Sequence, residues 1–383
     1  MIGLSRSWVR IVTLSAFIML VVACGSNGSS QRGSPGEDGT PSANDADDSR
    51  HITSETVDVD QWIELAMVDE PRPAPTGPVF PLTGLPAPGP DAAGITTRAA
   101  LVVKVDNHPR ARPQTGLELA DIVFDYRAEG VTRFAAVYQS TIPDPVGPVR
   151  SSRTSDFDLL SGLDNPLYAS SGGNNYVARE LRALPIVELT NLTRTEYFRD
   201  FSRNAPHNLY VNGSDLYRIA PADLSAPEPW FQYRREDEAL PKAALQVDGP
   251  VTIAFTGSPT VTHTWDESVG GWLRTQDRNP HTTAGGDQLA PENVVIMVTD
   301  YGTSPADPIS PHLRSTGEGP LVVLSDGHAI AGWWQRPTAD DKPLLLDGAG
   351  DEIALTPGRT WVLLPEPGQT AFPAGQVPAG WEG

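Results

Sequence analysis

Arginines gather beside the turns of one stretch of the chain, residues 121–153. The four arginines are Arg127, Arg133, Arg150 and Arg153. One glutamate, Glu129, lies in the turn between two strand-like runs of the same stretch. Guanidinium groups bind carboxylates and phosphates through paired hydrogen bonds, and side chains at turns can converge on a ligand. The stretch therefore predicts either a site for an anionic ligand or a set of internal ion pairs, since acidic residues are nearly as frequent there.

Further candidates for ligand binding lie in other loops of the same region. They are Arg112, Arg203, His207 and Asn107. Asp106 ends a predicted buried strand, the position at which ligands often bind in α/β proteins. Asp106 and Glu129 are the candidates for acid/base catalysis, should the protein be a hydrolase that uses two carboxylates.

The sequence assigns no metal ligands and leaves the cofactor unknown. His108 and His207 could be metal ligands, act as acid/base groups or hydrogen-bond loop carbonyls, but no His-x-His or His-Glu-x-x-His spacing occurs. A Gly-x-Ser-x-Gly nucleophile motif is also absent, although Ser151 and Ser152 lie between arginines.

The elements that must position these residues form a first domain over 95–225. Residues 99–106 are apolar and β-branched and predict a buried strand, and 121–127 with 132–140 predict a hairpin. Helical patterns over 154–163 and 175–184 follow. Because strands and short helices alternate, we expect an α/β or α+β fold with the ligand site.

The chain then changes character. A connector over 226–248 leads into residues 249–366, where short strand patterns are separated by Gly, Pro, Asp and Asn. This predicts a smaller, mainly-β domain, a sandwich or partly closed barrel. Its tryptophans could pack in the core or stack on sugar rings. Residues 367–383 are rich in Pro and Gly and predict a flexible tail.

The N-terminus predicts a lipoprotein. Arg6 and Arg10 precede a short apolar run, and Val-Val-Ala stands before the only cysteine, Cys24. This pattern resembles a bacterial lipobox, which implies cleavage of a signal peptide over 1–23 and attachment of diacylglyceryl and palmitate groups to Cys24. We expect residues 24–70 to be a disordered acidic tether and 71–94 a Pro-rich lead-in. The protein would then lie on the outer face of the cell membrane.

Net charge narrows the class of partner. The chain of 383 residues has a formal net charge of −20. Non-specific nucleic-acid binding needs basic surface that displaces counterions, so nucleic acid is excluded as a partner. The partners that remain are the membrane, bound through the lipid, and an anionic envelope polymer or a partner protein.

Long motifs in both regions resemble the YerB-like bacterial lipoproteins, a two-domain family of unknown function. The matching stretches include DNHPRARPQTGLELADIVFDYRAEGVTRFAAVYQS (106–140), VGPVRSSR (146–153), RNAPHNLY (203–210), ENVVIMVTDY (292–301) and SDGHAIAGWW (325–334). The resemblance implies a two-domain extracytoplasmic lipoprotein and supplies no reaction. One departure is Arg336, where the family pattern has a lysine close after the tryptophan.

Two classes of function remain open from the sequence. The first is a binding protein whose arginine-rich site takes an anionic envelope component or a partner protein. The second is an envelope hydrolase or transferase acting on glycan or phosphodiester bonds. A structure separates them by showing whether the arginines face an open cleft or are paired with carboxylates.

Overall fold

The computed structural model describes residues 77–88, 93–190, 195–235, 237–381 and 383, which belong to one compact unit. Cys24, the predicted signal peptide and the predicted tether lie outside these residues. A mixed sheet of eleven strands dominates the unit, in the order β18-β17-β16-β13-β19-β2-β3-β1-β4-β5, with β8 paired to β17. Its strands are β1 (Leu101–Asp106), β2 (Ile122–Arg127), β3 (Thr132–Tyr138), β4 (Leu167–Ala169), β5 (Val187–Glu188), β8 (Leu245–Gln246), β13 (Asn293–Met297), β16 (Gly317–Ser325), β17 (His328–Arg336), β18 (Leu344–Asp347) and β19 (Thr360–Leu363).

The central strands are apolar on both faces because each face is covered. Every residue of β1 is buried. Val103 belongs to the core on one side of the sheet, and Val102 to the core on the other side. A nearly continuous apolar run is typical of strands buried in this way. The charged Lys104 and Asp106 therefore stand out within β1.

One sheet unites the two regions that the sequence separates. β19 lies parallel to β2, with Val362 opposite Phe124. The fold class is confirmed, an α+β first part followed by a mainly-β second part. The shared sheet is an addition to that prediction, since β-strands of the second part extend the sheet of the first.

The remaining strands of the second part form a separate sheet in the order β12-β11-β10-β9-β20. They are β9 (Val251–Ile253), β10 (Val261–Asp266), β11 (Gly271–Gln276), β12 (Asn279–Pro280) and β20 (Thr370–Ala371). Trp272 and Trp334 are buried in the core, which excludes them from stacking on a sugar. The predicted tail contributes β20, and Trp381 packs edge-on against Phe372 because both rings bury apolar surface.

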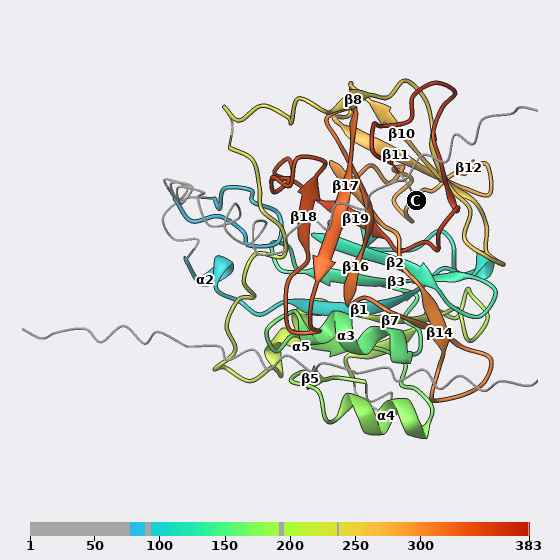
Figure 1. Ribbon diagram of the computed structural model, residues 1–383. Helices are drawn as coiled ribbons and strands as arrows, with labels where there is room; N and C mark the ends of the chain where they lie inside the picture. Colours follow the sequence, from blue (N-terminus) through green and yellow to red (C-terminus); the bar gives the residue numbers. More distant parts are fainter. Residues whose placement is uncertain (1–76, 89–92, 191–194, 236, 382) are drawn as a thin grey trace, which may run out of the picture. The chain divides into compact units, whose positions relative to one another are not determined.

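Helices are few and short. Figure 1 shows α3, α4 and α5 together beside β1 and β5, at the end of the unit away from β10 and β11. The helical elements are α2 (Ala93–Thr96), η2 (Pro109–Ala111), η3 (Leu117–Leu119), η4 (Thr154–Asp156), α3 (Phe157–Ser161), α4 (Asn175–Leu181) and α5 (Gly213–Arg218).

Two hairpins stand outside both sheets. β6 (Tyr197–Arg199) pairs with β7 (Leu209–Val211), within a segment whose polar sequence predicts irregular structure. β14 (Tyr301–Thr303) pairs with β15 (Pro311–Leu313). Both hairpins contact the candidate site described below.

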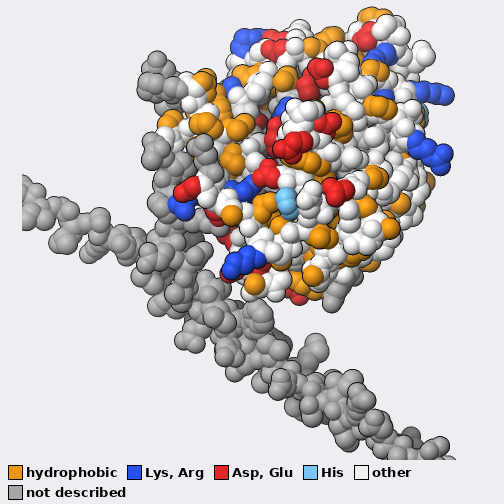
Figure 2. Space-filling model, turned by 90° about the horizontal axis from the view of Figure 1, so that it is seen from above, with side chains coloured by type: hydrophobic (Ala, Val, Ile, Leu, Met, Phe, Trp, Pro, Cys, Tyr) orange, Lys and Arg blue, Asp and Glu red, His pale blue; other side chains and the backbone are white. Residues whose placement is uncertain are grey.

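Charge is unevenly spread on the face shown in Figure 2. Acidic side chains gather near the middle of this face, while Lys and Arg side chains are scattered around it. The face therefore presents no broad basic surface of the kind that binds nucleic acid.

Candidate functional site

Asp106, at the end of β1, is the centre of a cluster of charged side chains. It is 1% exposed, and its Oδ2 lies 2.6 Å from His207 Nδ1 and 3.1 Å from Arg150 Nε. Its Oδ1 accepts a hydrogen bond of 3.0 Å from the His108 backbone N–H. The rings of His108 and His207 stack with centroids 4.4 Å apart. The structure thus brings together three candidates that lie far apart in the sequence.

Glu129 is the second carboxylate of the cluster. It accepts hydrogen bonds from Arg153 Nη2 at 3.0 Å and from Ser310 Oγ at 2.6 Å, and Arg133 Nη2 lies 3.2 Å away. Burial alone would raise the pKa of Glu129, but these hydrogen bonds and the arginine charges outweigh it and lower the pKa to about 2. A carboxyl group with this pKa is ionised at neutral pH, so the predicted role of Glu129 as a general acid is not supported.

Asn107 and Arg112 join loops to each other. Asn107 Nδ2 donates to Thr132 Oγ1 at 2.8 Å, and Asn107 accepts from Arg112 through its side chain and its backbone carbonyl. Arg112 Nη1 donates to Asp277 Oδ2 at 2.8 Å. All three nitrogens of this guanidinium are therefore engaged, which leaves it little capacity for a ligand.

Arg127 and Arg203 are also engaged. Arg127 Nη1 lies 2.6 Å from Glu366 Oε2, and its guanidinium stacks over the Tyr301 ring at 4.8 Å. Arg203 donates to the backbone carbonyls of Ala111 at 2.9 Å and Pro113 at 2.8 Å. Arg127 thus joins the end of β2 to the segment after β19, and Arg203 joins the β6–β7 hairpin to the loop around η2.

Arg150 differs from the other five arginines. Its Nε forms the ion pair with Asp106, and within the described part of the chain its two terminal nitrogens donate no hydrogen bond. The side chain is 22% exposed. Arg150 therefore offers a fork of unused donors at the end of β1, held in place by a buried carboxylate.

The positive and negative charges of the cluster nearly balance each other. Arg133, Arg150 and Arg153 share the carboxylates of Asp106 and Glu129. Burial lowers the pKa of Arg153. Glu129 raises it, and so does the charge of Asp307 at the rim of the cluster. The capacity to bind an anion thus rests on the free donors of Arg150 rather than on excess charge.

A buried polar network beneath the cluster was not predicted from the sequence. Lys104 Nζ lies 2.8 Å from Asp156 Oδ1, and both side chains are at most 1% exposed. Burial lowers the pKa of Lys104 to about 8, although Asp156 opposes the shift. The hydroxyl groups of Tyr126 and Tyr168 also bond to Asp156. A lysine in the middle of a mostly apolar strand was the available signal.

The serines of the arginine stretch bond to other hydroxyl groups. Ser151 Oγ lies 3.1 Å from Ser171 Oγ, and Ser152 Oγ donates to Ser170 Oγ at 2.7 Å. Neither hydroxyl is hydrogen-bonded to a histidine or carboxylate in the described residues. The arrangement gives no pair of nucleophile and base.

The described residues contain neither a group of metal-ligating side chains nor a membrane-spanning helix. No three His, Cys, Asp or Glu side chains there are grouped so that they could hold a metal ion. No helix there is long and apolar enough to cross a membrane.

Fold and site together define the class of protein. It is an α+β protein whose two parts share one mixed sheet, with a cluster of charged side chains at the end of β1. Residues 82–225 match the family described as "Protein of unknown function (DUF3048) N-terminal domain", and residues 251–362 match its "C-terminal domain". The chain belongs to this two-domain family.

Two relatives support this assignment. The chain is 28% identical over 298 residues to "Putative lipoprotein YerB" of Bacillus subtilis (strain 168), covering 74% of this chain and 84% of that protein. It is also similar to the crystal structure of the Bacillus subtilis YerB protein, with a TM-score of 0.66 and 23% identity. That match covers 77% of this chain and 99% of the other. The first match supports describing this chain as a lipoprotein, and the second shows the fold.

Proposed function

We propose that this protein is a lipid-anchored binding protein of the outer face of the cell membrane. Diacylglyceryl-Cys24 would hold it to the membrane, and the acidic segment over 24–70 would act as its tether. Arg150 would bind the anionic group of a cell-envelope polymer or partner protein. The observation that carries the proposal is the pair of terminal nitrogens on Arg150 that have no partner in the described residues.

The surroundings of Arg150 suit such a ligand. Asp106 fixes one edge of the guanidinium, so less side-chain entropy is lost when the other edge binds an anion. The β6–β7 hairpin, which carries His207, also presents Phe201 at 90% exposure and Phe198 at 42% exposure. Exposed aromatic rings on this hairpin would add apolar contact area for the body of a ligand that reaches it.

The hydrolase or transferase alternative is favoured by one observation. A buried carboxylate bonded to His207 Nδ1 orients the imidazole so that Nε2 can exchange a proton with a substrate. With Glu129 held ionised, Asp106 would act by positioning His207 rather than as one of two catalytic carboxylates. His207→Gln would then abolish bond cleavage while leaving binding of the anion at Arg150 in place.

Binding is tested on the chain from residue 24 onward, with Cys24→Ser to remove the lipid. A polyol-phosphate polymer and a uronic-acid polysaccharide are titrated by calorimetry, with a neutral polysaccharide as control. Loss of a hydrogen bond to a charged group costs about 1.5–3 kcal/mol. Arg150→Gln should therefore weaken binding of the anionic polymers about 10-fold to 100-fold.

The matched control is Arg182→Gln, which removes an exposed arginine at the end of α4. It changes the net charge by the same amount and should leave the affinity unchanged. Equal losses in both variants would show that net charge alone attracts the polymers, and the site at Arg150 would be rejected. Release of reducing ends or phosphate during the titration would favour the hydrolase.

A further inference from the structure

A pocket separate from the arginine cluster lies between the two parts of the chain. Its walls come from η3, β2 and β19, and from residues 287–291, with the β10–β11 turn at its rim. The cavity volume is about 290 Å³. This size lies at the lower end of the range of small-molecule sites, which are mostly apolar with a few polar groups that orient the ligand.

The lining is apolar over much of its area. Trp361, Leu289 and Val123 are buried side chains of the wall, each at most 4% exposed. Leu119 and Val269 add exposed apolar side chains at the rim, and Val269 is 57% exposed. A ligand with an apolar body would displace water from these surfaces.

Two polar atoms of the lining are buried without a partner. They are Glu118 Oε2 and Thr360 Oγ1, and Thr360 is only 2% exposed. A buried polar atom without a hydrogen bond costs free energy, so a donor supplied by a ligand would be favourable at both. Asp287, which is exposed, receives no hydrogen bond on its carboxylate within the described residues.

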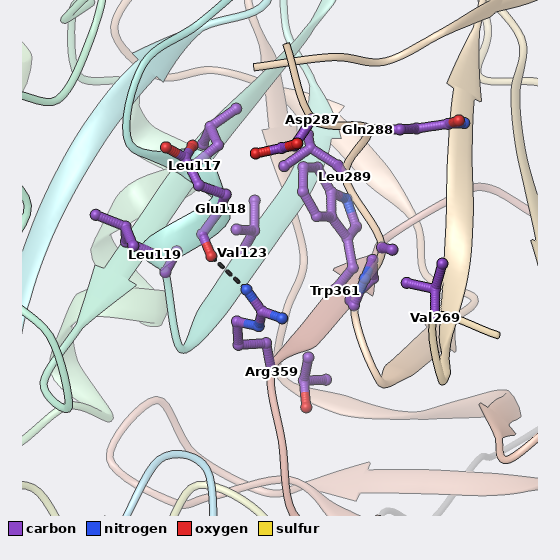
Figure 3. A pocket seen from close by; sticks show the side chains of 14 residues that line it. Leu117, Glu118, Leu119, Val123, Val269, Asp287, Gln288, Leu289, Arg359 and Trp361 are labelled. Atoms are coloured by element: carbon purple, nitrogen blue, oxygen red, sulfur yellow. Dashed lines mark hydrogen bonds between the residues drawn. The ribbon is translucent and has the colours of Figure 1, made fainter. Parts of the chain in front are cut away.

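The charge of the pocket is negative. Arg359 is its one cationic lining residue among those described, and Glu292 neutralises it through an ion pair of 3.0 Å. Arg359 Nη1 also donates to the Glu118 carbonyl at 2.6 Å, which is the dashed line in Figure 3. The same view shows Asp287 and the Glu118 side chain at the end of the pocket away from Arg359, with Trp361 and Val123 between. Two carboxylates are therefore left to bind a cation.

We propose that this pocket binds an organic ammonium ion with an apolar body. The ammonium group donates hydrogen bonds to Glu118 and Asp287, and the apolar body lies against Trp361, Leu289 and Val123. A carboxylate or phosphate would meet two like charges there, so the pocket rejects the class of ligand assigned to Arg150. The inference does not depend on the proposed function of the arginine cluster.

The experiment compares hexylammonium and hexanoate, which have the same chain length and opposite charge. Each is titrated by calorimetry into the chain from residue 24 onward with Cys24→Ser. Hexylammonium should bind at least about tenfold more tightly, because hexanoate meets repulsion. Affinity should rise about fourfold with each methylene from butylammonium to hexylammonium, as expected for an apolar contact.

Variants locate the binding. Glu118→Gln and Asp287→Asn should each weaken hexylammonium about 10-fold to 100-fold. Asp223→Asn, an exposed carboxylate outside the pocket, should leave it unchanged, and so should Arg150→Gln. Equal affinity for hexanoate, no dependence on chain length, or equal losses in Glu118→Gln and Asp223→Asn would overturn the proposal.

Discussion

Arg274 Nη2 lies 2.8 Å from Asp125 Oδ2, and neither side chain has any exposure to solvent. Arg274 belongs to β11 of the small sheet and Asp125 to β2 of the central sheet. The guanidinium also contacts His281 and lies 4.7 Å over the Trp361 ring. One ion pair thus joins the two sheets, and it joins the two regions that the family describes as separate domains.

Removing one partner of this ion pair should be strongly destabilising. Arg274→Met leaves the Asp125 carboxylate buried without its counter-charge, which costs about 3–5 kcal/mol. The free energy of unfolding is measured in urea. The double variant Arg274→Met, Asp125→Leu should lose less than the sum of the single variants, because neither charge remains unpaired. Additive losses would show that the pair is not coupled.

Acid should destabilise the same region through two buried histidines. Burial lowers the pKa of His263 and His281 well below 6.5, and the charge of Arg274 lowers them further. The unfolded chain therefore takes up protons that the folded chain does not. Stability is complete above about pH 6.5 and is lost as the pH falls below it, by up to about 2.7 kcal/mol per pH unit for two groups.

Urea unfolding at pH 7.5 and pH 5.5 measures this loss. His263 has both ring nitrogens buried without a partner, so His263→Leu should lower the pH dependence by about half. Parallel curves for the wild type and His263→Leu would contradict the assignment.

The fold was largely predictable where the apolar pattern is continuous. β1, β2 and β3 lie within the predicted runs because their side chains are buried on both faces. The pairing of β19 with β2 was not predictable, because it joins residues more than two hundred positions apart and no local pattern encodes a partner strand. β6 was missed because Phe198 and Arg199 are exposed, so no alternation marks the strand.

The site was predictable in its residue types and not in its pairings. Six arginines in or beside turns indicated either a ligand site or internal ion pairs, and in the structure five of them are engaged within the fold. Arg153 is saturated by Glu129 and the Ser152 carbonyl, whereas Arg150 keeps free donors. The two arginines pair with different carboxylates, Glu129 and Asp106, and Ser310 of the distant β14–β15 loop also donates to Glu129.

Arg153 and Arg150 should therefore respond differently to substitution. Arg153→Gln removes two hydrogen bonds to Glu129 and should lower the free energy of unfolding by about 1–3 kcal/mol. Arg150→Gln should change stability less, since its terminal nitrogens donate no hydrogen bond among the described residues and His207 stays beside the Asp106 carboxylate. Thermal unfolding of both variants at pH 7 provides the measurement. A larger loss for Arg150→Gln would show that its donors are already used within the fold.

Gly147 holds the loop that carries Arg150 against the hairpin that carries His207. A Cβ atom at Gly147 would lie 2.8 Å from the Leu209 carbonyl oxygen and 2.7 Å from Tyr210 Cδ1, so β7 would have to move. Gly147→Ala should cost about 1–3 kcal/mol in urea unfolding, as expected for overpacking. It should also weaken binding of the anionic polymers, because the Arg150–Asp106–His207 geometry depends on this contact. Gly302→Ala, where a Cβ atom would meet nothing within 4 Å, is the control. If Gly147→Ala were as stable as Gly302→Ala and bound the polymers normally, the close packing of β7 on this loop would not be what positions Arg150.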